Sequence, residues 1–351
     1  MQSLNTSLNV NISACRYQAM LGVGGIGTGV FFALNGEHTL GREESRSGHF
    51  IDRRDYCKLH IIAHYVQTLL GAEFVILPIG KVGTDEAGGR LLHEIGAVGI
   101  DLRHTQSVPG SQTLYSFCFI YPDGSGGNLT TDNSACDQLE PEDVSRAEVD
   151  FSRFQARGIA LAAPEVPLAA RRKLLELGTQ YHFLRVAAFN SAEILPALEM
   201  ELLTITDLLA LNRDEAAAVA GIKPENELPR TIVDQALAKL RTINPSLQVL
   251  ITAGKEGSWS WDGKSLRHLP AFPTRVVSTA GAGDAFLAGV ISGLAADLPL
   301  HLAQELGAMV AALSVTSPHT INPEIDRTSL LSVSSEFSLP LSETVKHLLQ
   351  A

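Results

Sequence analysis

A glycine-rich segment that ends in a carboxylate is the part of this chain whose residue types and spacing most clearly suggest chemistry. Residues 278–284 read Ser-Thr-Ala-Gly-Ala-Gly-Asp, and a helical pattern of apolar residues follows directly. Gly281 and Gly283 allow a tight turn with uncovered main-chain amides at the helix start, where the helix dipole favours phosphate. A carboxylate there can accept the proton of a hydroxyl that attacks a phosphoryl group. Asp284 is therefore a candidate base, although Asp is also a common N-cap and a purely structural role stays open.

A second glycine turn lies upstream, at the end of an apolar strand pattern. The sequence from Thr252 to Gly257 has the form Thr-x-Gly-x-x-Gly, with Gly254 at its centre. Such a turn can bring main-chain amides and a hydroxyl against the phosphates of a nucleotide. A tight turn without a ligand has the same spacing. Its place ahead of residues 278–284, in an alternating strand–helix register, favours nucleotide binding.

Asn212 and Glu215 follow another apolar strand pattern. An amide and a carboxylate three residues apart can hold the water shell of a Mg²⁺ ion that bridges triphosphate oxygens. The same spacing also forms a capping box, with Asn212 as the N-cap and Glu215 at the third helical position. The pattern by itself favours the capping box.

Residues 22–27, Gly-Val-Gly-Gly-Ile-Gly, match the glycine fingerprint of dinucleotide-binding proteins. That fingerprint requires a helix that begins at its third glycine. The residues after Gly27 are instead glycine, β-branched or aromatic, which favours a strand. The sequence therefore disfavours a dehydrogenase.

Charged side chains are dense between residues 41 and 60. A solvated loop is the default interpretation, and a strip that binds a polar substrate is the alternative. His60 and His64 lie four residues apart in an apolar helical pattern, where packing is more common than metal binding.

Composition narrows the class of protein. The chain has 351 residues and a net charge of −11, which argues against a general nucleic-acid binder. Its four cysteines lie far apart, a pattern typical of free thiols rather than of zinc or a disulfide framework. Residues 1–14 lack the features of a signal peptide, and no apolar stretch is long enough to span a membrane. We therefore expect a cytoplasmic protein with no membrane partner.

Strand and helix patterns alternate along most of the chain, which predicts an α/β fold with a mainly parallel sheet covered on both faces. The segments near 30–50 and 113–121 have strand patterns without intervening helices, which interrupts the alternation. We therefore expect them to form a small β lid. Residues 17–325 would form one domain. Residues 1–16 are expected to be a flexible tail, and residues 326–351 a second tail of unreadable function.

In this order along the chain the motifs resemble those of the ribokinase-like (PfkB) carbohydrate kinase family, from about residue 21 to residue 323. Residues 278–286 resemble its signature Asp-Thr-x-Gly-Ala-Gly-Asp-x-Phe, the most specific element. Residues 80–88 resemble Gly-x-Val-Gly-x-Asp-x-x-Gly, and residues 311–316 resemble a helix that borders the adenine pocket. The resemblance implies a three-layer αβα sandwich with a mainly parallel central sheet and a small β lid.

The resemblance also implies roles for particular residues in an ATP-dependent kinase that acts on a hydroxyl of a sugar or sugar-like molecule. Asp284 would be the base, and the amides of Ala280, Gly281, Ala282 and Gly283 would form the anion hole. Asn212 and Glu215 would position hydrated Mg²⁺. ATP would contact Thr252, Gly254, Gly257, Ala311 and Ser314. Members of the family commonly dimerise through the lid, so a homodimer is implied.

Three positions depart from the family pattern. Ser278 stands in place of an Asp that helps to organise a monovalent-cation site in several members, which puts potassium activation in doubt. Gly29 stands where sugar kinases usually carry an Asp that binds substrate hydroxyls. The family's glycine-rich first signature is replaced by a sequence that begins at Asp55. Because both of the latter losses fall on the acceptor pocket, Gly29, Arg46 and Lys58 are the candidate acceptor residues, and basic side chains would suit a charged or phosphorylated acceptor.

Two rival functions stay open. A nucleoside kinase of the same fold would need stacking partners for a base, which Phe31, Phe32 or Phe50 could supply. A nucleotide-binding regulator would have lost catalysis together with its sugar contacts, although the retained Asp284 argues against it.

Overall fold

Short apolar runs form the strands of a mainly parallel sheet in the computed structural model, which describes residues 6–36, 39–123, 126–337 and 339–350. Within these residues the sheet has nine strands in the order β13-β12-β11-β10-β9-β8-β1-β4-β5. Its strands are β1 Ala19–Val23, β4 Val75–Gly83, β5 Thr105–Val108, β8 Gly158–Ala162, β9 Leu184–Ala188, β10 Leu208–Asn212, β11 Gln248–Thr252, β12 Ser258–Trp261 and β13 Leu266–Leu269. Neighbouring strands pair in parallel along the part of this order that runs from β11 through β10, β9, β8, β1 and β4 to β5. Strand β12 pairs antiparallel with β11 and forms a hairpin with β13 at the edge of the sheet.

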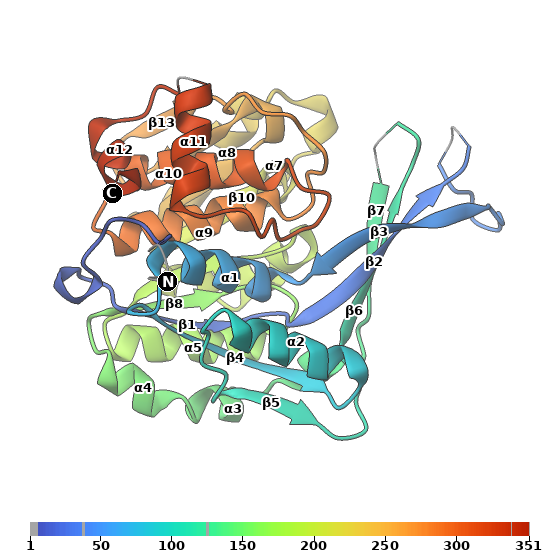
Figure 1. The fold of residues 1–351 in the computed structure, drawn as a ribbon, viewed down its shortest axis with the longest axis horizontal. Coiled ribbons are helices and arrows are strands. Elements are labelled where there is room, and N and C mark those ends of the chain that lie inside the picture. Colours follow the sequence, from blue (N-terminus) through green and yellow to red (C-terminus); the bar gives the residue numbers. More distant parts are fainter. Residues whose placement is uncertain (1–5, 37–38, 124–125, 338, 351) are drawn as a thin grey trace, which may run out of the picture.

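Helices cover both faces of this sheet, as Figure 1 shows. They are α1 Lys58–Leu70, α2 Glu86–Ala97, α3 Pro141–Ser145, α4 Glu148–Arg153, α5 Leu168–Gln180, α6 Ile194–Glu199, α7 Arg213–Ala220, α8 Pro229–Ile243, α9 Ala282–Ala295, α10 Leu300–Ser314, α11 Arg327–Glu336 and α12 Glu343–Leu349. One hydrophobic core contains side chains of α1, α2, α9 and α10, and a second contains those of α5, α7 and α8. Every residue of β1 and β8 is buried, as expected for strands covered on both sides.

A smaller sheet projects from one end of the molecule (Figure 1). Its strands are β2 Gly27–Leu34, β3 Gly48–Tyr56, β6 Leu114–Ile120 and β7 Gly126–Thr130, in the order β3-β2-β6-β7. The predicted lid is therefore confirmed as a separate sheet, and it includes β7, which the sequence pattern did not indicate. Since β2 begins directly after β1 and its glycine turn, residues 22–27 lead into a strand. This agrees with the expectation that they are not a dinucleotide site.

The described parts of the two chain ends, residues 6–16, 326–337 and 339–350, are more ordered than the tails that the sequence suggested, and residues 1–5 of the expected N-terminal tail lie outside the described residues. Leu8 and Ile12 are buried, and the Leu8 amide donates to the carbonyl of Leu69 in α1 at 2.7 Å. Residues 6–16 therefore pack against the domain. Beyond residue 325 the chain forms α11 and α12, whose buried Leu330 and Val345 join the same core. Apolar side chains spaced at helical intervals in these short segments were too few to predict this packing from the sequence.

The run Arg275-Val276-Val277 has a strand-like composition, but it is a loop in which 60 % of Val276 and 40 % of Val277 are exposed. The segment runs beside the end of α10, since the Val277 amide donates to the Val315 carbonyl at 2.7 Å. In the described residues no helix is both long and apolar enough to cross a membrane.

Candidate active site

The sequence motifs come together at the carboxyl ends of the parallel strands, the edge where open α/β sheets bind ligands. Asn212 is the last residue of β10 and Thr252 the last of β11, and the two are direct partners in the parallel register. The glycine turn after β1 and the Pro164-Glu165 segment after β8 lie at the same edge. Segments more than 200 residues apart in the chain therefore line one site.

Asp284 lies in the first turn of α9 but does not cap it. The N-cap position belongs to Gly281, and Asp284 is the third residue of the helix. Gly281 has φ +77°, a left-handed conformation that favours glycine, and a Cβ there would lie 2.8 Å from the Thr320 carbonyl oxygen. The structural alternative for Asp284, an N-cap, is therefore wrong. The turn at Gly281 aims the start of the helix, with Asp284 on it, at the edge of the sheet.

The main-chain amides of this turn differ in how they are used. The Ala280 amide donates to the Ser278 hydroxyl at 3.4 Å, and the Ala282 amide donates to the Thr279 carbonyl at 3.2 Å. Within the described residues the amides of Gly281 and Gly283 have no such acceptor. Two of the four amides expected in the anion hole are thus engaged inside the turn, and two remain for an anion at the N-terminus of α9.

Lys58 supplies the cation nearest to Asp284. It is the first residue of α1, and its Nζ lies 3.9 Å from Oδ1 of Asp284, of which 17 % of the side chain is exposed. Burial raises the pKa of Asp284 above its ordinary value, Lys58 opposes this shift, and the charge of Asp55 adds to it. In turn Asp284 raises the pKa of the Lys58 amine, against the effect of burial. The pair keeps Asp284 closer to its ionised form than burial alone would.

Glu165 is a site residue that the sequence reading missed. It follows β8 and has φ +75°, an uncommon conformation for a residue with a side chain. Its Oε2 accepts the backbone amide of Lys58 at 3.1 Å. Burial raises its pKa to about 7, with a further contribution from Asp284 against the effect of Lys58. One sequence feature could have indicated Glu165: it is a carboxylate that follows a buried strand, at the carboxyl edge of the sheet.

Asn212 and Glu215 form the capping box that their spacing favours. The Glu215 amide donates to Asn212 Oδ1 at 2.9 Å, and the Asn212 amide donates to Glu215 Oε2 at 2.7 Å. Burial raises the pKa of Glu215 to about 7, while Lys58 lowers it and Asp284 raises it, so this carboxylate lies within electrostatic reach of Asp284. The described residues contain no group of three or more His, Cys, Asp or Glu side chains that could hold a metal directly. A Mg²⁺ ion here fits only with water and nucleotide oxygens as its other ligands.

The residues expected to contact ATP lie on two elements. Gly254 and Gly257 bound a single turn of 3₁₀-helix after Thr252, with φ +55° and +85°. Ala311 and Ser314 lie in the last turn of α10, where the Ser314 hydroxyl donates to the Ala311 carbonyl at 2.8 Å. Ser314 is buried, so its hydroxyl serves the helix rather than an open surface.

The three candidate acceptor residues do not lie together. Arg46 belongs to the loop between β2 and β3 and its guanidinium pairs with Glu44 at 2.6 Å. That loop is nine residues from Asp55 along the chain, roughly 30 Å for an extended strand. Gly29 and Lys58 lie instead at the base of the lid, on the side of Asp284. Two other arginines of residues 41–60 form no ion pair with Asp284 in the described residues: Arg53 lies over the Phe31 ring, and Arg54 lines a separate cavity of about 540 Å³ with His60 and His319.

The two helical histidines behave as packing residues. Burial lowers the pKa of His60 to about 3 and that of His64 to about 4, so both rings are neutral at physiological pH. Their ring centroids are 6.4 Å apart.

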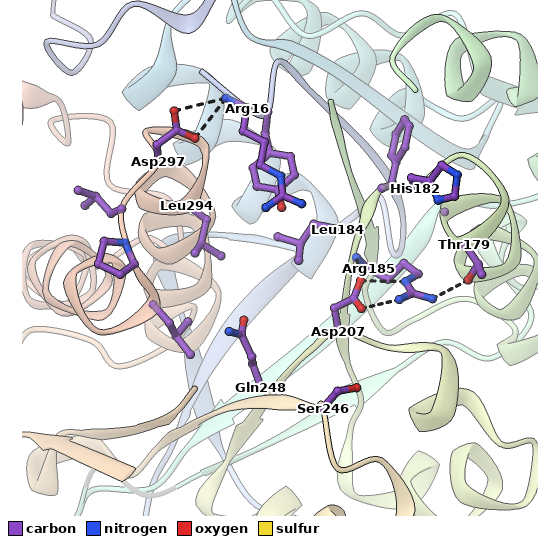
Figure 2. A pocket seen from close by; sticks show the side chains of 16 residues that line it. Arg16, Thr179, His182, Leu184, Arg185, Asp207, Ser246, Gln248, Leu294 and Asp297 are labelled. Carbon is purple, nitrogen blue, oxygen red and sulfur yellow. Dashed lines mark hydrogen bonds and ion pairs between the residues drawn. The ribbon is translucent and has the colours of Figure 1, made fainter. Parts of the chain in front are cut away.

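A cavity of about 750 Å³ lies at the opposite edge of the sheet, away from these groups (Figure 2). It is lined by residues at the amino ends of strands, such as Leu184 of β9 and Gln248 of β11. Figure 2 shows Arg185 held by Asp207 and Thr179, so this cation of the cavity wall is already paired. The cavity is larger than the one lined by Arg54, yet it lies away from the candidate site.

Comparison with known proteins agrees with this geometry. The model of the pfkB family carbohydrate kinases matches residues 63–327. This chain belongs to that family. Deoxyribokinase from Salmonella typhi is 26 % identical over 250 residues, which cover 70 % of this chain and 77 % of that protein. Ribokinase from Staphylococcus aureus is 27 % identical over 223 residues, 62 % and 67 % of the two chains.

The fold of this carbohydrate kinase is also that of solved ribokinases. The structure of Arabidopsis thaliana ribokinase complexed with ribose and ATP superposes with a TM-score of 0.70 at 19 % identity, over 90 % of this chain and 98 % of that one. The predicted three-layer ribokinase-like sandwich with a β lid is confirmed. The family membership makes the chain a sugar kinase, and the dehydrogenase alternative is excluded.

Proposed function

We propose that this kinase transfers the γ-phosphoryl group of ATP to a hydroxyl of an uncharged sugar, with Asp284 as the base. The observation that carries the proposal is the position of this carboxylate, which lies in the first turn of α9 beside the unengaged amides of Gly281 and Gly283. A base and an anion site on one helix start can serve the two sides of a phosphoryl transfer.

In the reaction the acceptor O–H bond breaks as its proton passes to the Asp284 carboxylate. The oxygen forms a bond to the γ-phosphorus, and the bond between that phosphorus and the bridging oxygen breaks to release ADP. The amides of Gly281 and Gly283 and the dipole of α9 stabilise the negative charge on the transferring group. Lys58 favours the ionised form that Asp284 needs in order to accept the proton.

Magnesium would be held by Asn212 and Glu215 through water, and it would neutralise charge on the phosphates of ATP. Thr252, Gly254 and Gly257 would contact the nucleotide from the end of β11, and Ala311 with its neighbours on α10 would border the base. The side chains of Asn212 and Thr252 support this role because they start from neighbouring strand ends.

The charges around Asp284 favour an uncharged acceptor over the phosphorylated one that the basic loop suggested. Asp55, Glu165 and Asp284 act on one another electrostatically, and Lys58 is the cation that acts on all three. An acceptor phosphate placed here would meet more negative than positive charge. A sugar hydroxyl can instead donate to these carboxylates.

The experiment that tests this is ATP consumption by the purified chain with D-ribose, 2-deoxy-D-ribose, D-fructose, D-ribose 5-phosphate and adenosine. We expect turnover with one or more free sugars. Turnover confined to the sugar phosphate would contradict the uncharged acceptor. Turnover with adenosine would favour the nucleoside kinase, for which Phe31 is the one stacking candidate on the Asp55 side of the lid. ATP binding without turnover on any compound would favour the regulator.

We further propose that two copies of the chain associate through the lid. Phe32, Phe50 and Phe117 pack together on one face of the lid sheet. On this face 66 % of Phe50 is exposed, and Leu129, the cross-strand partner of Phe117, is 64 % exposed. Exposed apolar clusters of this kind are typical of interaction surfaces. Light scattering after size exclusion should give a dimer for the natural chain and a monomer for Phe50→Asp, and a monomeric natural chain would contradict the proposal.

A further inference from the structure

A glycine and a buried carboxylate face each other at the base of the lid. Gly29 of β2 and Asp55 of β3 are direct partners in the antiparallel register. Asp55 is only 6 % exposed, although carboxylates are rarely buried without a cation in contact. Its Oδ2 accepts the Ser116 hydroxyl, and the Cys118 thiol lies 3.5 Å from the same oxygen. Proton transfer to Asp284 and transfer of the phosphoryl group do not by themselves require this carboxylate.

Because Gly29 has no side chain, there is space beside it for the carboxylate of Asp55. A Cβ at position 29 would lie 2.6 Å from Oδ2 of Asp55 and 2.3 Å from Oγ of Ser116. Such distances are far below van der Waals contact, and the same Cβ would lie 2.5 Å from the Ser116 carbonyl oxygen. Position 29 therefore has no space for a side chain in this geometry, and the carboxylate of Asp55 lies in the space beside it.

The charge of Asp55 also acts on Asp284. Burial raises the pKa of Asp55, and Lys58 is among the groups that oppose the shift. The charge of Asp55 in turn raises the pKa values of both Asp284 and Glu165. Both of its side-chain donors converge on one oxygen and both are neutral, whereas an ionised carboxylate offers about four acceptor positions. The group therefore keeps capacity for hydroxyl donors from a ligand.

We infer that Asp55 binds a hydroxyl of the acceptor sugar, and that Gly29 is the space which lets it do so from β3. This inference rests on the proposed function. The carboxylate of Asp55 thus reaches the β2 side of the strand pair, beside position 29, from β3. Asp55 recognises and orients the acceptor, and Asp284 accepts the proton.

The test removes the carboxylate and fills the space in separate variants. Asp55→Gly and Gly29→Ala are compared with the natural chain in steady-state assays with D-ribose, 2-deoxy-D-ribose and D-fructose. Loss of a hydrogen bond to a charged group predicts a rise in the acceptor KM of about 10- to 100-fold for Asp55→Gly, with the KM for ATP unchanged. Gly29→Ala should also raise the acceptor KM, because its Cβ would press on the Asp55 carboxylate and on the Ser116 carbonyl.

Two further variants guard the interpretation. Asp52→Gly removes an exposed acid from the same strand and should leave the acceptor KM unchanged. If Asp55→Gly does not fold, as judged by circular dichroism, Asp55→Asn keeps the shape and removes the charge, and it should give the same rise in acceptor KM. An unchanged acceptor KM in a folded Asp55 variant would overturn the inference.

Thermal shift separates this inference from the proposed function. The melting temperature is measured with each sugar in the presence of a non-hydrolysable ATP analogue. If a sugar stabilises the natural chain without being phosphorylated, and Asp55→Asn abolishes the stabilisation, the role of Asp55 stands and the proposed reaction fails. If no sugar of the panel is bound or phosphorylated, both fail.

Discussion

The proposed phosphoryl end and the proposed acceptor end of this site are built in different ways. The phosphoryl end consists of residues 212–215, 252–257 and 281–284, each a short segment that directly follows a strand or begins a helix. The acceptor end consists of Gly29, Asp55, Lys58, Ser116 and Glu165, which come from β2, β3, α1, β6 and the loop after β8. Main-chain geometry fixes the first, whereas side chains that meet across distant segments fix the second. Chemistry held by local backbone turns can persist while recognition is rearranged around it.

The largest effect should come from the group at which the two ends meet. Asp284→Asn keeps the size of the side chain and removes the base, so kcat should fall about 10²- to 10⁴-fold while the affinity for ATP stays within about threefold. Stopped-time assays of ADP release and titration with an ATP analogue measure the two quantities. Asp234→Asn, an exposed acid on α8, is the matched control. A kcat within about tenfold of the natural value would remove Asp284 from the base role.

The metal position tests the phosphoryl end more finely. Glu215→Gln retains an oxygen that can accept the Asn212 amide, so the capping box survives while the charge is lost. The Mg²⁺ concentration required for half-maximal rate should rise about 10- to 100-fold. Asp137→Asn alters another capping box and should leave the Mg²⁺ requirement unchanged. If both variants titrate alike with Mg²⁺, Glu215 is only a helix cap.

Substitutions of two glycines distinguish backbone strain from an effect on catalysis. Gly281→Ala should cost about 1–2 kcal/mol of stability for its left-handed φ and lower kcat about tenfold, because the new Cβ would press on the Thr320 carbonyl and displace the free amides. Gly221 has the same φ of +77° but open space around it, so Gly221→Ala should lower the melting temperature and leave kcat unchanged. Equal kcat values for the two variants would show that the Gly281 turn does not position the anion site.

The smallest effect concerns the coupling of the two ends through Lys58. A carboxylic base works only when ionised, so activity is lost as pH falls through the pKa of Asp284, which burial already raises. Lys58→Met removes the cation that lowers this pKa, so the acid limb of the kcat profile should move to higher pH. The exposed Lys239→Met is the control. An unmoved acid limb would contradict this coupling.

Much of the fold and of the phosphoryl end could be predicted from the sequence. Apolar runs with the right period predicted α1, α9, α10 and most of the parallel strands, since burial on both faces leaves a local pattern. The strand β9 and the packed ends of the chain were missed, because their apolar residues are few and gain meaning only against distant partners. Arg46 was grouped with Lys58 by proximity in sequence, yet the hairpin carries it away from the site.

The sequence alone determined the turns that precede helices, such as the one at residues 278–284. Glycine, hydroxyl and carboxylate residues at a fixed spacing form these turns through contacts within the same short segment. Only the tertiary structure decided that Gly29 and Asp55 share one space, that Glu165 reaches the amide of Lys58, and that Asp284 is not a cap. The physical reason is that these contacts depend on strand register and on burial. Both bring together residues that are far apart in the chain, and their spacing in the sequence does not indicate the contact.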